Sequence, residues 1–196
     1  MIFEHQHFFF NSIPKTGSKS TTWWCEHNGM QQVRANKIGK PIFATYRDTR
    51  DRIISGITED LYFITKEQHG LTGEETFSLV ESMYRHVAET WSLVPYHPIS
   101  KVQCHYGTLQ SYLGSQVDLS RVHWVPMNQI DQIDQIINTT LGFDADLTAL
   151  PKEQFILETN RPPKEWFYNI ISKNKSAVDW IEQRIQQDYK PELLSR

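Results

Sequence analysis

Short apolar runs alternate along the chain with stretches in which apolar residues recur at intervals of three and four. Three of these runs, at residues 7–13 (HFFFNSI), 41–47 (PIFATYR) and 121–127 (RVHWVPM), are rich in aromatic and β-branched residues and predict buried strands. The stretches after these runs, and a longer one in the middle of the chain, predict helices. The predicted helices cover residues 18–28, 48–57, 72–94, 128–142 and 176–189.

Several of these helices begin or end at residues that favour helix termini. Asp48 can cap the helix at 48–57, and Thr72 with Glu75 forms a capping box for the helix at 72–94. Asn128 is expected to cap the helix at 128–142, and Gly142 is expected to end it.

The order of elements favours one fold class. Strands alternate with helices, and no linker-like segment interrupts the pattern. We therefore expect an α/β fold, with a single domain over residues 1–196 and a mainly parallel central sheet flanked by helices. In such sheets, ligands bind at the carboxyl ends of the strands.

Composition and charge argue against several classes of protein. The 196-residue chain has a net charge of −3, so we expect no nucleic-acid partner. Cys25 and Cys104 give neither a disulfide framework nor a metal-ligand spacing. The N-terminal residues lack the features of a secretory signal, and no stretch approaches the roughly 20 apolar residues that span a bilayer. We expect a soluble, cytoplasmic protein with no membrane partner and make no prediction of its oligomeric state.

Residues 11–24 (NSIPKTGSKSTTWW) join the first predicted strand to the first predicted helix. A loop that leads into a helix N-terminus presents N–H groups and the positive end of the helix dipole to an anion. Gly17 lets the backbone approach that anion closely, and two lysines add charge. We predict a phosphate-binding loop with the contact residues Lys15, Thr16, Gly17, Ser18, Lys19, Ser20 and Thr21.

The P-loop of nucleotide-hydrolysing enzymes, G-x-x-x-x-G-K-[ST], is one candidate for this loop. When the pattern is aligned on Lys19, its first Gly is replaced by Ile13 and its second by Ser18. The loop would then have the wrong shape to wrap a β-phosphate. A P-loop kinase or NTPase stays an alternative, and a non-catalytic nucleotide-binding module is another.

The segment IPKTGSKST matches a different loop more closely. It resembles the 5′-phosphosulfate loop of the sulfotransferases, which usually has the form P-K-[ST]-G-[ST]-T. The resemblance implies a P-loop-like α/β fold and the co-substrate 3′-phosphoadenosine 5′-phosphosulfate, with no metal. Lys15 matches the catalytic lysine of that family and Ser18 its first loop hydroxyl, whereas Lys19 stands where many members have Thr.

A second segment, IFATYRDTRDRIISG, resembles the 3′-phosphate motif of the same family, a strand followed by R-[DN]-P-x-x-R-x-x-S. The resemblance implies that Arg47 and Ser55, eight residues apart, bind the 3′-phosphate. An arginine at a strand end can place two parallel donors on phosphate oxygens. Thr49 replaces the usual Pro, and Arg52 matches an inner arginine that we interpret as structural.

Later segments bear on the acceptor. The segment HYGTLQSYLG, together with the strand and helix predicted after it, resembles carbohydrate-type sulfotransferases, which implies a glycan acceptor, although a small-molecule hydroxyl or amine stays open. Most of the aromatic rings that could contact a sugar are expected in the core. Arg161, in a segment that resembles a late loop of the family, is a candidate for covering the 3′-phosphate or adenine; the alternative is a surface arginine.

Sulfuryl transfer needs positioning and charge stabilisation more than covalent chemistry. The resemblance implies that Lys15 neutralises the bridging oxygen as the bisphosphate leaves. A general base would activate the acceptor, and the candidates are Glu59, Asp60 and His105. His27 is disfavoured because a straight helix, at about 1.5 Å per residue, carries it roughly 13 Å from the loop.

Overall fold

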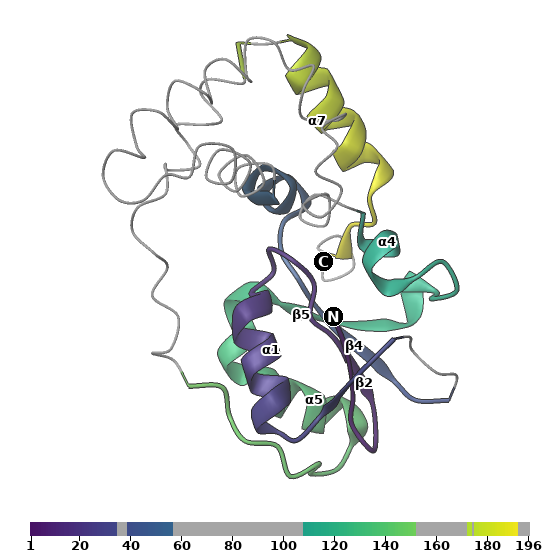
Figure 1. Cartoon of the computed structure of the whole chain (residues 1–196), viewed down its shortest axis with the longest axis vertical. Coiled ribbons are helices and arrows are strands. Elements are labelled where there is room, and N and C mark those ends of the chain that lie inside the picture. Colours follow the sequence, from purple (N-terminus) through teal and green to yellow (C-terminus); the bar gives the residue numbers. More distant parts are fainter. Residues whose placement is uncertain (35–38, 57–107, 152–171, 174, 192–196) are drawn as a thin grey trace, which may run out of the picture. The chain divides into compact units, whose positions relative to one another are not determined.

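A computed structural model describes residues 1–34, 39–56, 108–151, 172–173 and 175–191 (Figure 1). The chain divides into two compact units. The first, which we call the sheet unit, comprises Met1–Asp48, Thr108–Ile156 and Tyr189–Arg196. The second comprises Thr49–Gly107 and Leu157–Asp188. That residues 1–196 form a single domain stays a prediction.

The sheet unit is built on a five-stranded sheet in the described residues, with the strand order β3-β1-β2-β4-β5. Its strands are β1 (Ile2–Glu4), β2 (Phe9–Asn11), β3 (Gln31–Val33), β4 (Ile42–Tyr46) and β5 (Val122–Pro126). β2 pairs with β4, and β4 with β5, in parallel, whereas β1 pairs antiparallel with both β2 and β3. The α/β class is confirmed, and the three predicted strands are present.

The prediction of a mainly parallel sheet is wrong for the described strands, because the sheet is mixed. The chain reverses tightly after β1, where the N–H of His5 donates to the carbonyl of Phe8 (2.9 Å), and returns as β2. β3 then adds antiparallel to the other side of β1. β1 and β3 are only three residues long, so neither carries enough sequence to show a strand period.

The helices of the sheet unit agree with the predictions in part. α1 (Ser18–His27) and α5 (Ile133–Leu141) are present, and Gly142 ends α5 in the left-handed conformation (φ 77°). α4 (Leu109–Leu113), capped by the side chain of Thr108, has no counterpart among the predicted helices. Short 3₁₀ turns, η1 (Leu119–Arg121) and η2 (Met127–Gln132), flank β5.

The prediction that Asn128 caps a helix over 128–142 is wrong. The chain instead forms the 3₁₀ turn η2, broken by a non-helical Gln129, and α5 begins only at Ile133 with Gln132 as its N-cap. Pro126 leads into η2 from an extended conformation. Of the three isoleucines spaced three apart in this segment, Ile130 lies in η2, whereas Ile133 and Ile136 lie in α5.

The second unit contains two described helical segments. Residues 49–56 are helical, as predicted for 48–57, and α7 (Lys175–Gln187) confirms the predicted C-terminal helix. Buried isoleucines Ile53 and Ile54 lie on the first of these. The predicted helix at 72–94 and its capping box lie outside the described residues.

Apolar clusters cover both faces of the sheet at its central strands. On one face, Phe43 and Val125 pack in a cluster with Trp24 of α1 and Ile137 of α5, and Figure 1 shows both helices on the same side of the strands. On the other, Ala44 packs with apolar residues of α4 and β5. Cys25 lies in the first cluster, where burial raises the pKa of its thiol, consistent with a structural cysteine. Within the described part of the chain, no helix has both the length and the apolar character to cross a membrane.

Candidate functional site

The loop between β2 and α1 begins with a tight turn over residues 13–16. The N–H of Thr16 donates to the carbonyl of Ile13 (3.4 Å), Pro14 occupies the second position, and Lys15 has φ 64° at the third. These are the features of a type II β-turn, whose third position usually holds Gly or Asn because φ is positive there. Lys15 therefore adopts a backbone conformation that few lysines adopt.

Gly17 ends the loop and caps α1 in the left-handed conformation (φ 82°). A left-handed residue followed by right-handed helical ones turns successive N–H groups towards the same side and forms an anion-binding concavity. The N–H of Thr21 is the first to bond within the helix, to the carbonyl of Gly17 (3.0 Å). The N–H groups of Ser18, Lys19 and Ser20 precede it and have no acceptor in the preceding turn of the helix.

Hydroxyl groups hold the loop to β4 and to the first turn of α1. The Thr16 hydroxyl donates to the carbonyl of Ile13 (2.9 Å) and lies 2.7 Å from the hydroxyl of Thr45 in β4. The Ser12 hydroxyl donates to the carbonyl of Ser18 (3.0 Å) and lies 2.9 Å from that of Thr21. The side chains of Thr16 and Thr21, both predicted as ligand contacts, are therefore buried and used within the fold. Contact of either residue with an anion through its backbone stays a prediction.

The 3₁₀ turn η2 packs against the loop at Gly17. A Cβ atom added at Gly17 would lie 2.5 Å from Cδ1 of Ile130, so the bare α-carbon of the glycine packs against this isoleucine. The positive φ favours Gly at position 17, and any larger residue would in addition force the Ile130 side chain to shift. The predicted hydroxyl contact Ser18 is half-buried, and Lys19 is exposed in the first turn of α1.

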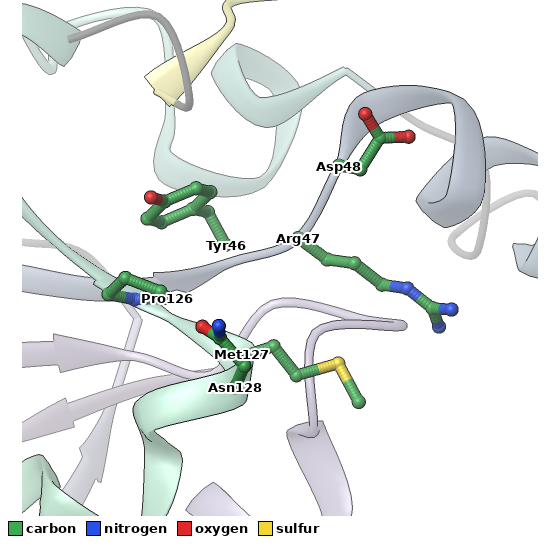
Figure 2. Close-up of a pocket in the computed structure, with 6 residues that line it drawn as sticks. All are labelled: Tyr46, Arg47, Asp48, Pro126, Met127 and Asn128. Carbon is green, nitrogen blue, oxygen red and sulfur yellow. The ribbon is translucent and has the colours of Figure 1, made fainter. Parts of the chain in front are cut away.

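A pocket of about 390 Å³ opens where β4 and β5 end. It is lined by Tyr46, Arg47, Asp48, Pro126, Met127 and Asn128 (Figure 2). Figure 2 shows the side chain of Arg47 extending away from Tyr46. The pocket combines a guanidinium, a carboxylate and an amide with apolar groups, the mixture found in small-molecule sites.

The loop and Arg47 lie at the same edge of the sheet because β2 and β4 are parallel neighbours, with Asn11 opposite Ala44. Both strands therefore end at the same side, where the loop follows β2 and Arg47 follows β4. The contact between Thr16 and Thr45 ties the two motifs together. The first motif and the part of the second motif that ends at Asp48 therefore lie close together, and phosphate binding by either segment stays a prediction.

The remainder of the second motif belongs to the second unit. There, Arg52 is fully buried and forms an ion pair with Asp188, which agrees with the structural role predicted for it. Arg50 forms a more exposed ion pair with Glu182. Ser55 is half-buried in the helical segment, and its contact with the 3′-phosphate stays a prediction.

The residues considered as a general base lie mostly beyond the described part of the chain. His27 is the last residue of α1, exposed and stacked on Trp23 (ring centroids 3.5 Å apart), which confirms that the helix carries it away from the loop. The candidates Glu59, Asp60 and His105, and the candidate donor contact Arg161, lie outside the described residues. Among the described residues, no three His, Cys, Asp or Glu side chains gather as a metal-binding group.

Sequence reasoning missed three contributors to this site. Thr45 interrupts the apolar run of β4 with a polar side chain at a buried position, which is a usable signal for a specific internal contact. Ile130 and Met127 gave no such signal, because their roles depend on how η2 folds against the loop and the strand ends.

Comparison with known proteins gives no independent information on this site. Searches against protein-family models, curated proteins and solved structures found no match. The function is therefore inferred from the residues of the site.

Proposed function

We propose that this chain is a sulfotransferase that moves a sulfuryl group from 3′-phosphoadenosine 5′-phosphosulfate to a hydroxyl or amine acceptor. The observation that carries the proposal is the parallel pairing of β2 with β4. It puts the loop that contains Lys15 and the strand-end Arg47 at one edge of the sheet. A donor with a phosphosulfate on one ribose carbon and a phosphate on another needs two cationic sites close together.

Each charged part of the donor has a proposed partner. The N–H groups from Gly17 to Ser20, with the Ser18 hydroxyl, hold the 5′-phosphate at the N-terminus of α1. Lys15 neutralises the negative charge that develops on the bridging oxygen as the bisphosphate leaves. Arg47 binds the 3′-phosphate through two parallel N–H donors, and the contact expected from Ser55 rests on the sequence motif alone.

The pocket at the ends of β4 and β5 suits the nucleoside of this donor. Its volume of about 390 Å³ lies within the range of small-molecule sites, about 300–1,000 Å³. Met127 and Pro126 offer apolar surface to a base or ribose, and the amide of Asn128 offers a donor and an acceptor. Arg47 is shared between this pocket and the proposed 3′-phosphate site.

The fold of the loop favours this proposal over a P-loop kinase or NTPase. Ile13, at the position of the first P-loop glycine, is 1% exposed and belongs to a core cluster. The tight turn after Ile13 places Thr16 against β4. The segment before Gly17 therefore packs on the sheet, whereas in a P-loop it would wrap around a β-phosphate. The general base, expected among Glu59, Asp60 and His105, and a glycan or small-molecule acceptor are parts of the proposal.

Binding and turnover together test the proposal. Thermal shift and calorimetry with adenosine 3′,5′-bisphosphate, ATP with magnesium, and AMP should show the largest stabilisation with the bisphosphate. At a ligand concentration 100 times Kd, binding adds about 2.7 kcal/mol to the free energy of unfolding. Transfer of labelled sulfate from the donor is then measured on a panel of glycan, phenol and amine acceptors.

The two alternatives give different results in the same assays. Preferential stabilisation by ATP with magnesium would replace the proposal with a kinase or NTPase. Bisphosphate binding without transfer to any acceptor in the panel would favour the non-catalytic nucleotide-binding module.

A further inference from the structure

Two buried threonines join the phosphate loop to the sheet. Thr16 in the loop and Thr45 in β4 are both 0% exposed, and their hydroxyl oxygens lie 2.7 Å apart although 29 residues separate them in the chain. A buried hydroxyl is costly unless it is hydrogen-bonded, so this contact is specific.

The direction of the hydrogen bonds is set by the number of protons. A threonine hydroxyl has one proton to donate. Thr16 donates its proton to the carbonyl of Ile13 (2.9 Å), so in the bond between the two hydroxyls Thr45 is the donor and Thr16 the acceptor. The result is a chain of two hydrogen bonds that runs from β4 through Thr16 to the residues just after β2. Hydrogen bonds in such chains polarise and strengthen one another.

This hydrogen-bond chain ends on the turn that contains Lys15. The carbonyl of Ile13 accepts from both the N–H and the hydroxyl of Thr16, which closes the turn over residues 13–16. Inside that turn, Lys15 has φ 64° without being Gly or Asn. Residues persist in this conformation where the surrounding structure holds them there.

We infer that Thr16 and Thr45 are positioning residues for Lys15. Their hydrogen-bond chain keeps the turn closed and so maintains the left-handed backbone from which the Lys15 side chain projects. The functional part of this inference rests on the proposed function, in which Lys15 acts on the leaving group. The conformational part concerns the turn alone and stands by itself.

The test removes the donor of the chain with little change of shape. Thr45→Val replaces the hydroxyl by a methyl group, and Thr45→Ser restores the donor. Thr140→Val is the matched control, because the Thr140 hydroxyl donates to the carbonyl of Ile136 (2.8 Å) on the exposed side of α5, away from the loop. Crystal structures give φ of Lys15, and hydrogen exchange gives the protection of the Thr16 N–H, in each protein without ligand.

In Thr45→Val we expect φ of Lys15 to become negative and the Thr16 N–H to exchange about tenfold faster, as loss of one buried hydrogen bond allows. We expect kcat for sulfuryl transfer to fall about tenfold while the affinity for adenosine 3′,5′-bisphosphate changes less than about threefold, since Lys15 acts mainly in the transition state. Thr45→Ser should restore both φ and kcat, and Thr140→Val should leave both unchanged.

Two results would overturn the inference. One is a Thr45→Val protein in which Lys15 keeps its positive φ and the Thr16 N–H keeps its protection. The other is a loss of kcat that Thr140→Val shares or that Thr45→Ser does not rescue. A wild-type protein that neither binds the bisphosphate nor transfers sulfate would instead remove the proposed function, and φ of Lys15 with the exchange rate would still decide the conformational part.

Discussion

At the scale of single residues, Lys15 unites a positive charge with a left-handed backbone at the start of the loop. Lys15→Ala should lower the rate of sulfuryl transfer by at least about 10²-fold, as loss of a group that stabilises developing charge does elsewhere. Bisphosphate affinity should fall much less, because the charge acts mainly on the leaving group. Lys175→Ala, which removes an exposed lysine of α7, is the control. Near-normal turnover of Lys15→Ala would mean that the loop is not the transfer site.

Arg47 tests the other end of the proposed donor. Adenosine 5′-phosphosulfate lacks the 3′-phosphate, so Arg47→Ala should weaken the bisphosphate at least tenfold and leave adenosine 5′-phosphosulfate nearly unaffected. The expected loss of about 1.5–3 kcal/mol corresponds to a charge-assisted hydrogen bond. Calorimetry with both ligands measures it, and Arg121→Ala, an exposed arginine of η1, serves as control. Equal losses for the two ligands would show that Arg47 does not bind the 3′-phosphate.

Short sequence patterns indicate the charged candidates and Gly17 more readily than the residues that hold the loop in place. Lys15, Gly17 and Arg47 belong to short local patterns, and the structure brings these patterns to one edge of the sheet. Thr45 belongs to no pattern, because its partner Thr16 lies 29 residues away and only the pairing of β2 with β4 brings them together.

At the scale of elements, local rules failed where a tertiary contact competes with them. Asn128 has the chemistry of a helix cap, yet η2 takes its place and Ile130 packs against Gly17. β1 and β3 were missed because three residues show no period, and pairing with neighbours defines them. β2, β4 and β5 lie within the longer apolar runs at residues 7–13, 41–47 and 121–127, which needed no such context.

The contact between the loop and η2 can be measured as a coupling energy. Gly17→Ala should lower the free energy of unfolding by about 1–2 kcal/mol for the left-handed backbone alone, and more because its Cβ meets Cδ1 of Ile130. Ile130→Val removes that atom, so Gly17→Ala should cost less in the Ile130→Val background. Urea denaturation of the four proteins gives the difference, expected above about 0.5 kcal/mol. Strictly additive costs would contradict the contact.

Two ion pairs join the helical segment at 49–56 to the segment 182–188, and they differ in burial. Arg52 and Asp188 have side chains 0% and 1% exposed, whereas those of Arg50 and Glu182 are 42% and 37% exposed. Asp188→Ala removes a carboxylate from a buried guanidinium and should lower the free energy of unfolding by about 3–5 kcal/mol. Glu182→Ala should cost at most about 1 kcal/mol. Chemical denaturation of both variants checks the prediction, which similar losses would refute.

At the scale of the whole molecule, stability should respond to pH through His5 in the reverse turn between β1 and β2. Burial lowers the pKa of His5, and the nearby His7 and Lys40 lower it further. The ring nitrogen Nδ1 of His5 accepts from the N–H of His7 (3.4 Å), and Lys40 is held nearby by an ion pair with Glu4.

The sign of the effect is given by proton binding. The unfolded chain binds a proton at His5 more readily than the folded chain, so the free energy of unfolding rises with pH from the lowered pKa up to about 6.5. His5→Gln should flatten the pH dependence of Tm in this window. His27→Gln, at the end of α1, is the control, and an unchanged pH profile in His5→Gln would contradict the assignment.

The strand order of the sheet also determines which strands can pair early and which must wait during synthesis. β1, β2, β3 and α1 all lie within the first 33 residues and can pair with one another as soon as they emerge from the ribosome. β4 ends at Tyr46 and its outer neighbour β5 begins only at Val122, so at about 5–20 residues per second the gap lasts about 4–15 s. During that time the backbone N–H and C=O groups on the outer side of β4 (IFATY) are open to pairing with any other strand. Low temperature slows misassembly, and a chaperone can cover the unpaired side of β4. Either treatment should therefore raise the yield of folded protein.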